Sequence, residues 1–410
     1  MAYSVLADSV SVYVNDNPLP SGIVQSVSVE TALDKEDLIT LTVLNPFTGT
    51  SNNQTRTSQL RFIDATAFAT GQHLEVRFIQ QGEEVSLARG IIQEWLPVFP
   101  ESGLATLTLK AYGGGILMMD GTPSVNAHDA RAFSENMTIS EVVSQVVNDY
   151  GFEPDVEMLF EVPQRPILKK AGMTDYAFLK GLANLVGLDF FIKWDQSLGK
   201  FRVTWKEGAL TDPFSLDMIW GPDYDKSSGR AIPLLSFEPS FAINGNPSNV
   251  EVYYYDQDGG IWERVIYPAR EENKEGKGSN ELEWQNSALT GENVAPTSME
   301  QDIASATESN SARGLRIKAG GFSVEVVPNE GLRTAEDAVR FAEAWWKQRQ
   351  RSLILGKGRI WGFNKIRAGQ VHNLQGLGAG LSGEWFFSEV NHDYSEGVYT
   401  IDFVCRKVIT

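Results

Sequence analysis

Short runs of alternating hydrophobic and polar residues fill residues 1–115. Clear examples are Ser26–Glu30, Leu74–Phe78 and Ala105–Lys110, and turn residues such as Asn15–Pro18 separate them. A period of two places successive side chains on opposite faces of a β-strand. The pattern therefore predicts short strands that form a sandwich or a barrel.

The hydrophobic period becomes helical in the middle of the chain. Thr138 and Glu141 have the spacing of a capping box, and apolar residues then recur on one helical face until Gly151. A second helix is predicted after Thr174. The following run, Leu188–Glu207, predicts a β-hairpin, so this part of the chain is α+β.

The β pattern returns from Ile232 and is interrupted by a polar stretch and one more helix. Thr334 precedes that helix, in which Trp345 and Trp346 are predicted to pack against a core rather than bind a ligand. The whole pattern predicts a mainly β fold with α+β insertions. Its predicted parts are a β-barrel at 1–118, a middle α+β domain at 119–230, and a second β-barrel at 231–410 with a polar insertion loop at 271–313 and a helix at 335–351.

Two blocks of the sequence echo each other. Thr70–Leu74 and Ala368–His372 both contain Gly-Gln, and each is followed by a Gly and a Glu-Trp pair, Glu94-Trp95 in one and Glu384-Trp385 in the other. We interpret the echo as two copies of one β unit, one at each end of the chain. Chance similarity between two hairpins remains the alternative. Different strand orders in the two units would favour that alternative. Three such chains would place six similar units around one axis.

Composition limits the possible functions. The 410 residues carry 35 Lys and Arg against 53 Asp and Glu, a net charge of −18. An acidic chain is poorly suited to gripping phosphate backbones. No 18-residue apolar run is present and the N-terminus lacks the pattern of a secretory signal, so neither a membrane span nor secretion is predicted. The one cysteine, Cys405, allows no intrachain disulfide and is predicted to be a buried strand residue.

A glycine pattern near the C-terminus raises the question of a cofactor. Gly378, Gly380 and Gly383 have the G-x-G-x-x-G spacing of a dinucleotide loop. That loop requires a helix after the glycines, whereas the aromatic run Glu384–Val390 predicts a strand. The glycines are therefore interpreted as a hairpin loop.

No catalytic, cofactor-binding or metal-binding residue is predicted. Zinc, thiol, nucleophile-elbow and phosphate-loop motifs are missing from the sequence. Its four histidines, of which His372 and His392 could share one sheet, do not have the spacing of metal ligands on one element. We expect a protein that is not an enzyme.

The segment Gly172–Phe191 resembles the D-x-x-F-L-x-x-L-A-x-x-x-G segment of phage late-control D proteins. These are baseplate hubs of contractile-tailed phages, related to the hub part of the type VI secretion VgrG proteins. The Ala-Gly-Gln block, Gly383–Trp385 and the His392–Cys405 hairpin look like the C-terminal barrel of that family. The resemblance implies that both predicted barrels are tail-tube-like.

The resemblance also implies partners and a location. It suggests a homotrimeric virion protein, assembled in the host bacterial cytoplasm, that joins the hexameric tail tube or tube initiator to a trimeric central spike. Its lumen would pass the tape measure protein and then DNA without specific binding, and an acidic wall suits that passage. Because the chain ends after the second barrel, the spike is expected to be a separate polypeptide. Baseplate wedge proteins would be further partners, and loop 271–313 is a hypothetical docking arm for a neighbouring baseplate protein.

Two other functions stay open at this point. A hub-associated peptidoglycan hydrolase would use some of the many carboxylates as an acid and base pair. No segment of domain size remains for it once the hub pattern is laid over the chain. A peripheral carbohydrate-binding β protein would expose aromatic residues in loops, whereas most Trp and Tyr here lie in strand or helix patterns.

Overall fold

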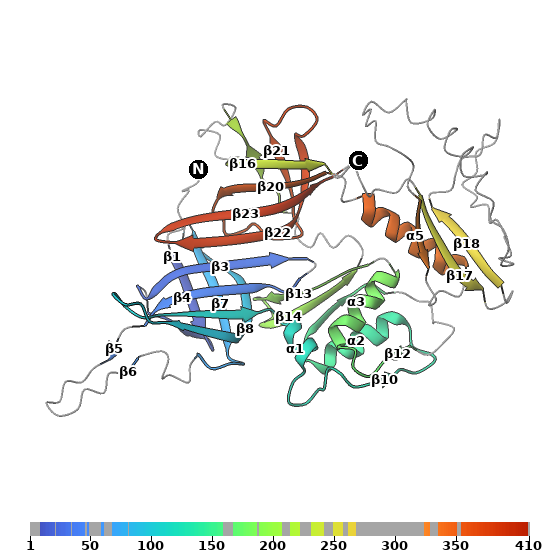
Figure 1. The fold of residues 1–410 in the computed structure, drawn as a ribbon, viewed down its shortest axis with the longest axis horizontal. Coiled ribbons are helices and arrows are strands. Elements are labelled where there is room, and N and C mark those ends of the chain that lie inside the picture. Colours follow the sequence, from blue (N-terminus) through green and yellow to red (C-terminus); the bar gives the residue numbers. More distant parts are fainter. Residues whose placement is uncertain are drawn as a thin grey trace.

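The computed structural model shows a long twisted sheet with two smaller α/β parts beside it (Figure 1). It describes residues 9–20, 22–33, 35–45, 47–48, 59–60, 68–80, 82–158, 167–186, 188–206, 214–221, 231–241, 249–256, 261–267, 324–328, 335–350 and 354–408. The predicted insertion loop 271–313 lies outside these residues. The predicted fold class, mainly β with α+β insertions, is confirmed.

The N-terminal part of the sheet, here called the first β unit, has six principal strands. They are β1 (Ser9–Val14), β3 (Val24–Ala32), β4 (Leu38–Leu44), β7 (His73–Gln80), β8 (Glu83–Val98) and β9 (Thr106–Tyr112). Three short strands accompany them, β2 (Asn17–Pro18), β5 (Phe47–Thr48) and β6 (Gln59–Leu60). Every second side chain of β4 and β9 is buried, as the alternating sequence requires.

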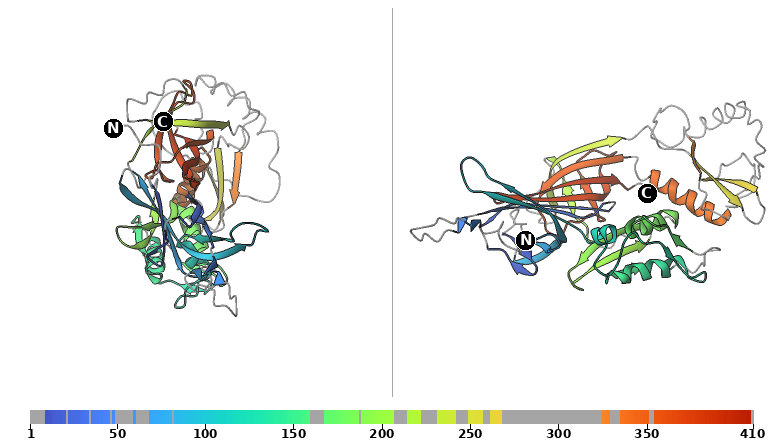
Figure 2. Two further views of the ribbon diagram at one scale, coloured as in Figure 1. Left: turned by 90° about the vertical axis from the view of Figure 1, so that its left-hand side faces the viewer. Right: turned by 60° about the horizontal axis from the view of Figure 1, so that its bottom comes forward.

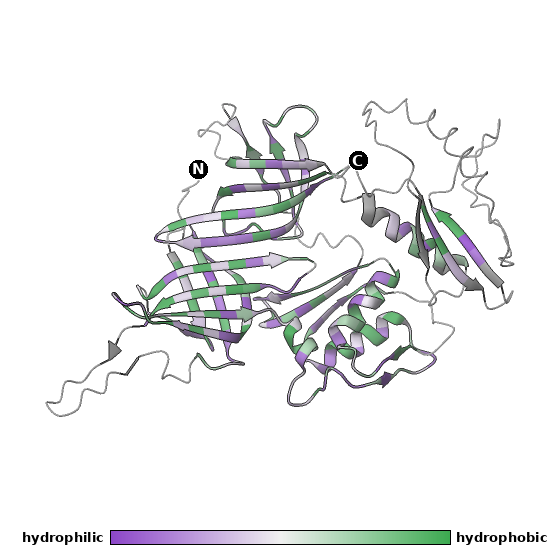
Figure 3. Cartoon of the chain, viewed as in Figure 1, coloured by the Kyte–Doolittle hydropathy of each residue, from purple (hydrophilic) through white to green (hydrophobic). Residues whose placement is uncertain are grey.

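The second β unit also has six strands, and these close into a barrel. They are β15 (Asp217–Ile219), β16 (Ala231–Phe241), β20 (Ile354–Trp361), β21 (Val371–Gln375), β22 (Gly383–Ser395) and β23 (Val398–Lys407). The ring runs β22-β21-β15-β16-β20-β23 and closes by the pairing of β23 with β22. Hydrophobic and polar residues alternate along these strands (Figure 3).

The two β units have the same strand order. Numbered within each unit in chain order, the strands lie 1-4-5-6-3-2 across the sheet: β1-β7-β8-β9-β4-β3 in the first unit and β15-β21-β22-β23-β20-β16 in the second. The main difference is that β1 pairs antiparallel with its neighbour, whereas β15 pairs parallel. The order supports the interpretation of two copies of one β unit.

The Gly-Gln pair of the echo occupies the same place in both units. In the first, the amide of Gly71 donates to the carbonyl of Ile92 at 2.8 Å, and in the second Gly369 donates to Phe387 at 2.8 Å. Both glycines have positive φ, 87° and 94°. The Glu-Trp half of the predicted echo is wrong, because Trp385 is fully buried whereas Trp95 is 46% exposed.

The two units join edge to edge through a pairing that we call the internal seam. It places β3 residues Ser26–Ala32 antiparallel to β22 residues Glu389–Ser395, and the result is one continuous 13-stranded sheet. In Figure 1 the blue β3 lies directly beside the red β22. One hydrophobic core runs through both units.

The middle of the chain forms an α+β layer beside the first β unit, with the β13–β14 hairpin next to β8 (Figure 1). Its elements are α1 (Gly115–Asp120), β10 (Arg131–Ala132), α2 (Ile139–Asp149), β11 (Glu153–Val156), β12 (Leu168–Lys169), α3 (Asp175–Val186), β13 (Asp189–Asp195) and β14 (Lys200–Lys206). The predicted capping box of α2 and the hairpin are confirmed. This layer has its own core, with Trp205 fully buried in it.

A second small layer holds the third predicted helix. It contains β17 (Asn249–Asp256), β18 (Ile261–Tyr267), β19 (Val324–Pro328) and α5 (Ala335–Gln350). As predicted, Trp345 and Trp346 pack inward, their rings 5.7 Å from Phe341 and 5.8 Å from Tyr267. This layer interrupts the second β unit between β16 and β20, and α5 contacts α3.

The domain limits drawn from the sequence stay predictions. Two elements, however, pack against a different part of the chain from the one to which those limits assign them. Strand β15 falls inside the span predicted for the middle domain, yet it pairs with β16 and β21 of the barrel. Helix α5 was assigned to the second barrel and instead packs on β17 and β18.

Candidate interaction surface

The glycines of the cofactor-like pattern lie in the loop between β21 and β22. Leu381 and Ser382 both donate backbone hydrogen bonds to the carbonyl of Gly378, and the chain then continues as β22. Gly378 and Gly383 have positive φ, 83° and 126°. The interpretation as a hairpin loop is confirmed, since no helix begins there to hold a phosphate.

His372 holds two segments of the barrel together. Its Nδ1 accepts a hydrogen bond from the amide of Leu216 at 3.2 Å, and its Nε2 lies 3.1 Å from Oε1 of Gln370. Both ring nitrogens therefore have protein partners, and the ring is fully buried.

His392 is likewise buried and paired on both nitrogens. Its Nε2 donates to the carbonyl of Ile366 at 2.9 Å, so Nδ1 is left to accept from the hydroxyl of Tyr399 at 2.6 Å. Burial, and next the charge of Arg367, lower the pKa of His392 well below its usual value. Both histidines thus have the structural role that the sequence favoured.

Cys405 is buried in β23, as predicted, and burial raises the pKa of its thiol. A thiol with a raised pKa is a poor nucleophile, because the thiolate is the reactive form. Within the described part of the chain, no three His, Cys, Asp or Glu side chains are grouped as metal ligands.

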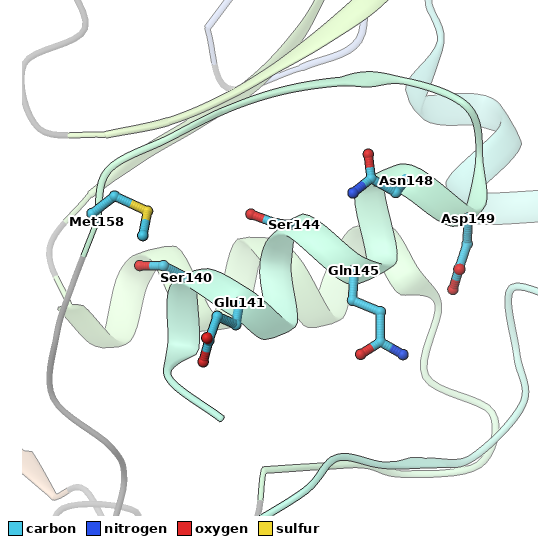
Figure 4. A pocket seen from close by; sticks show the side chains of 7 residues that line it. All are labelled: Ser140, Glu141, Ser144, Gln145, Asn148, Asp149 and Met158. Atoms are coloured by element: carbon cyan, nitrogen blue, oxygen red, sulfur yellow. The ribbon is translucent and has the colours of Figure 1, made fainter. Parts of the chain in front are cut away.

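An open hollow of about 410 Å³ lies on the outer face of α2 (Figure 4), lined by Ser140, Glu141, Ser144, Gln145, Asn148, Asp149 and Met158. Its two carboxylates are eight residues apart on one helix, about 12 Å along the axis. Glu141 accepts from the amide of Thr138 at 2.8 Å, and Asp149 accepts from Arg131 at 2.6 Å. A glycosidase needs two carboxylates facing each other across a sugar, so this hollow gives the hydrolase alternative no support.

A second hollow, of about 540 Å³, lies where the first β unit meets the β13–β14 hairpin. Its charges are also paired: Arg202 lies 2.8 Å from Asp195, and Lys193 pairs with Asp37. Neither hollow holds an activated nucleophile.

The most distinctive surface is the far end of the β8–β9 hairpin. Large apolar side chains gather there: Trp95 is 46% exposed, Leu96 48%, Val98 52%, Phe99 62% and Leu104 52%. The teal hairpin extends beyond the body of the sheet in the right-hand view of Figure 2. Exposed apolar patches of this kind mark interaction surfaces.

The sequence carries a signal for this surface that strand alternation alone does not reveal. From Trp95 to Phe99 the alternation breaks down into a continuous apolar run that includes Pro97. A strand with one buried face needs only every second residue to be apolar. The run therefore suggests a strand end whose two faces are both covered by other surfaces. The Glu-Trp echo pointed the other way, because it matched Trp95 to Trp385, which is a core residue.

Solved structures resemble the whole chain. The 43 kDa tail protein of prophage MuSo2 from Shewanella oneidensis matches with a TM-score of 0.60 at 13% identity, over 97% of this chain and 97% of that one. A tail protein from Neisseria meningitidis matches with a TM-score of 0.60 at 11% identity, over 97% and 96%. This chain has the fold of phage tail proteins.

A type VI secretion component from Escherichia coli is also similar. That protein is described as structurally similar to the bacteriophage T4 tail proteins gp27 and gp5, and it matches with a TM-score of 0.51 at 10% identity, over 97% of this chain and 77% of that one. No protein-family model and no curated protein matches the sequence. The resemblance suggested by Gly172–Phe191 is therefore confirmed at the level of the fold.

Proposed function

We propose that this tail-fold protein is the structural hub of a contractile phage baseplate and has no enzymatic role. Three chains form a ring that adapts the hexameric tail tube to a trimeric central spike, and the ring encloses a lumen for the tape measure and DNA. The observation that carries the proposal is the matching strand order of the two β units. Three copies present six similar units, which fits a sixfold partner on one face and a threefold partner on the other.

The likeness to tail proteins over nearly the whole chain supports the same role. The partners that follow are the tail tube or its initiator, a separately encoded spike, and neighbouring baseplate proteins. The location is the virion tail, after assembly in the host cytoplasm. In the described residues no helix is long and apolar enough to cross a membrane.

Mass measurement tests the proposal directly. We expect the purified protein to have the mass of three chains, either alone or after mixing with its spike protein, and electron microscopy to show a central hole. A single chain under both conditions, without a hole, would overturn the ring.

A further inference from the structure

The internal seam covers an edge that would otherwise be open. Strand β22 extends past the end of β21, and β3 covers the extension from Glu389 to Ser395. On the core-facing side, Val390 and His392 of β22 and Val29 of β3 are fully buried. On the opposite face of the sheet, a hydrogen bond of 2.9 Å from the hydroxyl of Ser28 to the side chain of Asn391 joins the two strands.

The first β unit repeats this extension but lacks the cover. Strand β8 corresponds to β22, and its register shift between Ile92 and Glu94 corresponds to the shift between Phe387 and Glu389. Beyond the shift, Glu94–Val98 pairs with β9 on one side only, among the residues that the structure describes. This uncovered edge carries the apolar side chains of the hairpin end.

The second β unit also has a strand that corresponds to the covering strand, and part of one edge of that strand is unpaired among the residues that the structure describes. Strand β16 corresponds to β3, and their register shifts, between Leu234 and Ser236 and between Val24 and Ser26, match. Within the described ranges, β16 past the shift pairs with β20 on one side, and β15 reaches residues 231–233 of the other edge and no further. Residues 238–240 are all exposed, which is unusual for a strand of a closed barrel.

Each chain therefore contains one completed seam and both halves of a second. We propose that the β8 end of one chain pairs antiparallel with the free edge of β16 in a second copy, in the register of the internal seam. That register puts Leu96 opposite Ser240, Val98 opposite Glu238 and Phe99 opposite Phe237. This inference rests on the proposed ring and identifies the two edges that close it.

The side chains fit the pairing. Pro97 faces the core side, like its β9 partner Leu107, and the alternation continues to Phe99, two residues further on. The register brings these two residues against Pro239 and Phe237. Apolar side chains of the two chains therefore face each other on the core side. Neither proline can donate a main-chain hydrogen bond, so this seam depends on side-chain burial more than the internal one does.

The pairing is head to tail, because β8 and β16 are different surfaces. Heterologous contacts close into rings when the rotation allows it. In a ring of three chains, internal seams would alternate with the proposed seams between chains. Every β unit would then have two neighbouring β units, joined to it by the same kind of pairing.

Disulfide cross-linking tests the register. Facing residues of an antiparallel pair lie about 4.5–5.5 Å apart between Cα atoms, within disulfide range. We expect the L96C/S240C protein, oxidised at the concentration where the native chain is trimeric, to run as a covalent trimer without reductant. The matched control is L96C/S236C, which moves the second thiol about 13 Å along the same strand and should stay uncross-linked. The native Cys405 is buried and does not interfere.

The possible results separate this inference from the proposed function. A native trimer in which L96C/S240C fails to cross-link, or in which both pairs react equally, overturns the seam and leaves the ring standing. A covalent ladder longer than three chains supports the seam and contradicts the closed trimer. A monomer that cross-links in neither variant overturns both.

Discussion

At the scale of single residues, the contact between the first β unit and the α+β layer depends on two neighbouring carboxylates. Glu36 accepts a hydrogen bond from the amide of Gly115 at 2.7 Å, while Lys193 pairs with Asp37 and donates to the carbonyl of Ala32 at 2.8 Å. Burial, and next the charge of Asp37, raise the pKa of Glu36 to about 7. Lys193 pairs directly with Asp37, and its charge offsets only part of the rise in the pKa of Glu36.

This arrangement predicts a pH-dependent stability. The folded state holds the Glu36 proton up to pH 7, whereas the unfolded chain releases it near pH 4.5, so stability falls as pH rises through that window. Glu36→Gln keeps the acceptor for Gly115 without the charge. We expect the variant to match the native protein at pH 4.5 and to exceed its unfolding free energy at pH 8, by at most about 3 kcal/mol.

Urea unfolding at the two pH values measures the difference. Glu101→Gln, at an exposed site, is the control and should change stability equally at both. An equal effect of Glu36→Gln at pH 4.5 and pH 8 would contradict the assignment.

At the scale of elements, α2 shows how local sequence fixes a helix start. The Thr138 hydroxyl accepts from the amide of Glu141 at 3.2 Å, and the Glu141 carboxylate accepts from the amide of Thr138 at 2.8 Å. We expect Thr138→Ala to lower the unfolding free energy by about 1 kcal/mol, as measured by urea unfolding. Gln145→Ala, exposed on the same helix, should leave it nearly unchanged; a loss as large as that of Thr138→Ala would argue against the cap.

The β8 end is an element whose apolar residues do not serve the fold of its own chain. Phe99 is 62% exposed, so Phe99→Asp should leave the unfolding free energy of the isolated chain within about 0.5 kcal/mol. It should, however, break the ring by placing a charge against Phe237 of a second copy. Sedimentation velocity reports the change from trimer to monomer.

Leu198→Asp is the matched control, because Leu198 is 44% exposed in the turn between β13 and β14, away from both free edges. That variant should remain trimeric. If both variants dissociate, or neither does, the β8 end is not the interface.

At the scale of the whole molecule, the hub proposal and the hydrolase alternative predict different behaviour toward cell walls. We expect the purified protein to leave the turbidity of a peptidoglycan suspension unchanged, since the carboxylates of the α2 hollow are held by a cap and by Arg131. Lysozyme provides the positive control. Clearing by this protein would favour the hydrolase.

Much of the architecture could be predicted from local pattern. Alternation identified the strands, Thr138 and Glu141 marked the start of α2, and the aromatic residues after Gly383 ruled out a dinucleotide loop. The Gly-Gln echo found the duplication, because a positive φ at that turn requires the same residue type in both copies. The Glu-Trp echo failed, since side-chain identity alone does not say which strand covers a residue.

The sequence by itself determined which segments are strands or helices, where α2 begins, the acidic character and the presence of two related β units. Only the tertiary structure decided that β3 covers β22, a pairing between residues more than 350 positions apart, and that the equivalent edges of β8 and β16 have no partner strand in the described part of the chain. The physical reason is that a strand presents the same hydrogen-bonding groups on both edges. The residues of a strand therefore do not specify which strand pairs with it. That choice depends on how the whole sheet closes.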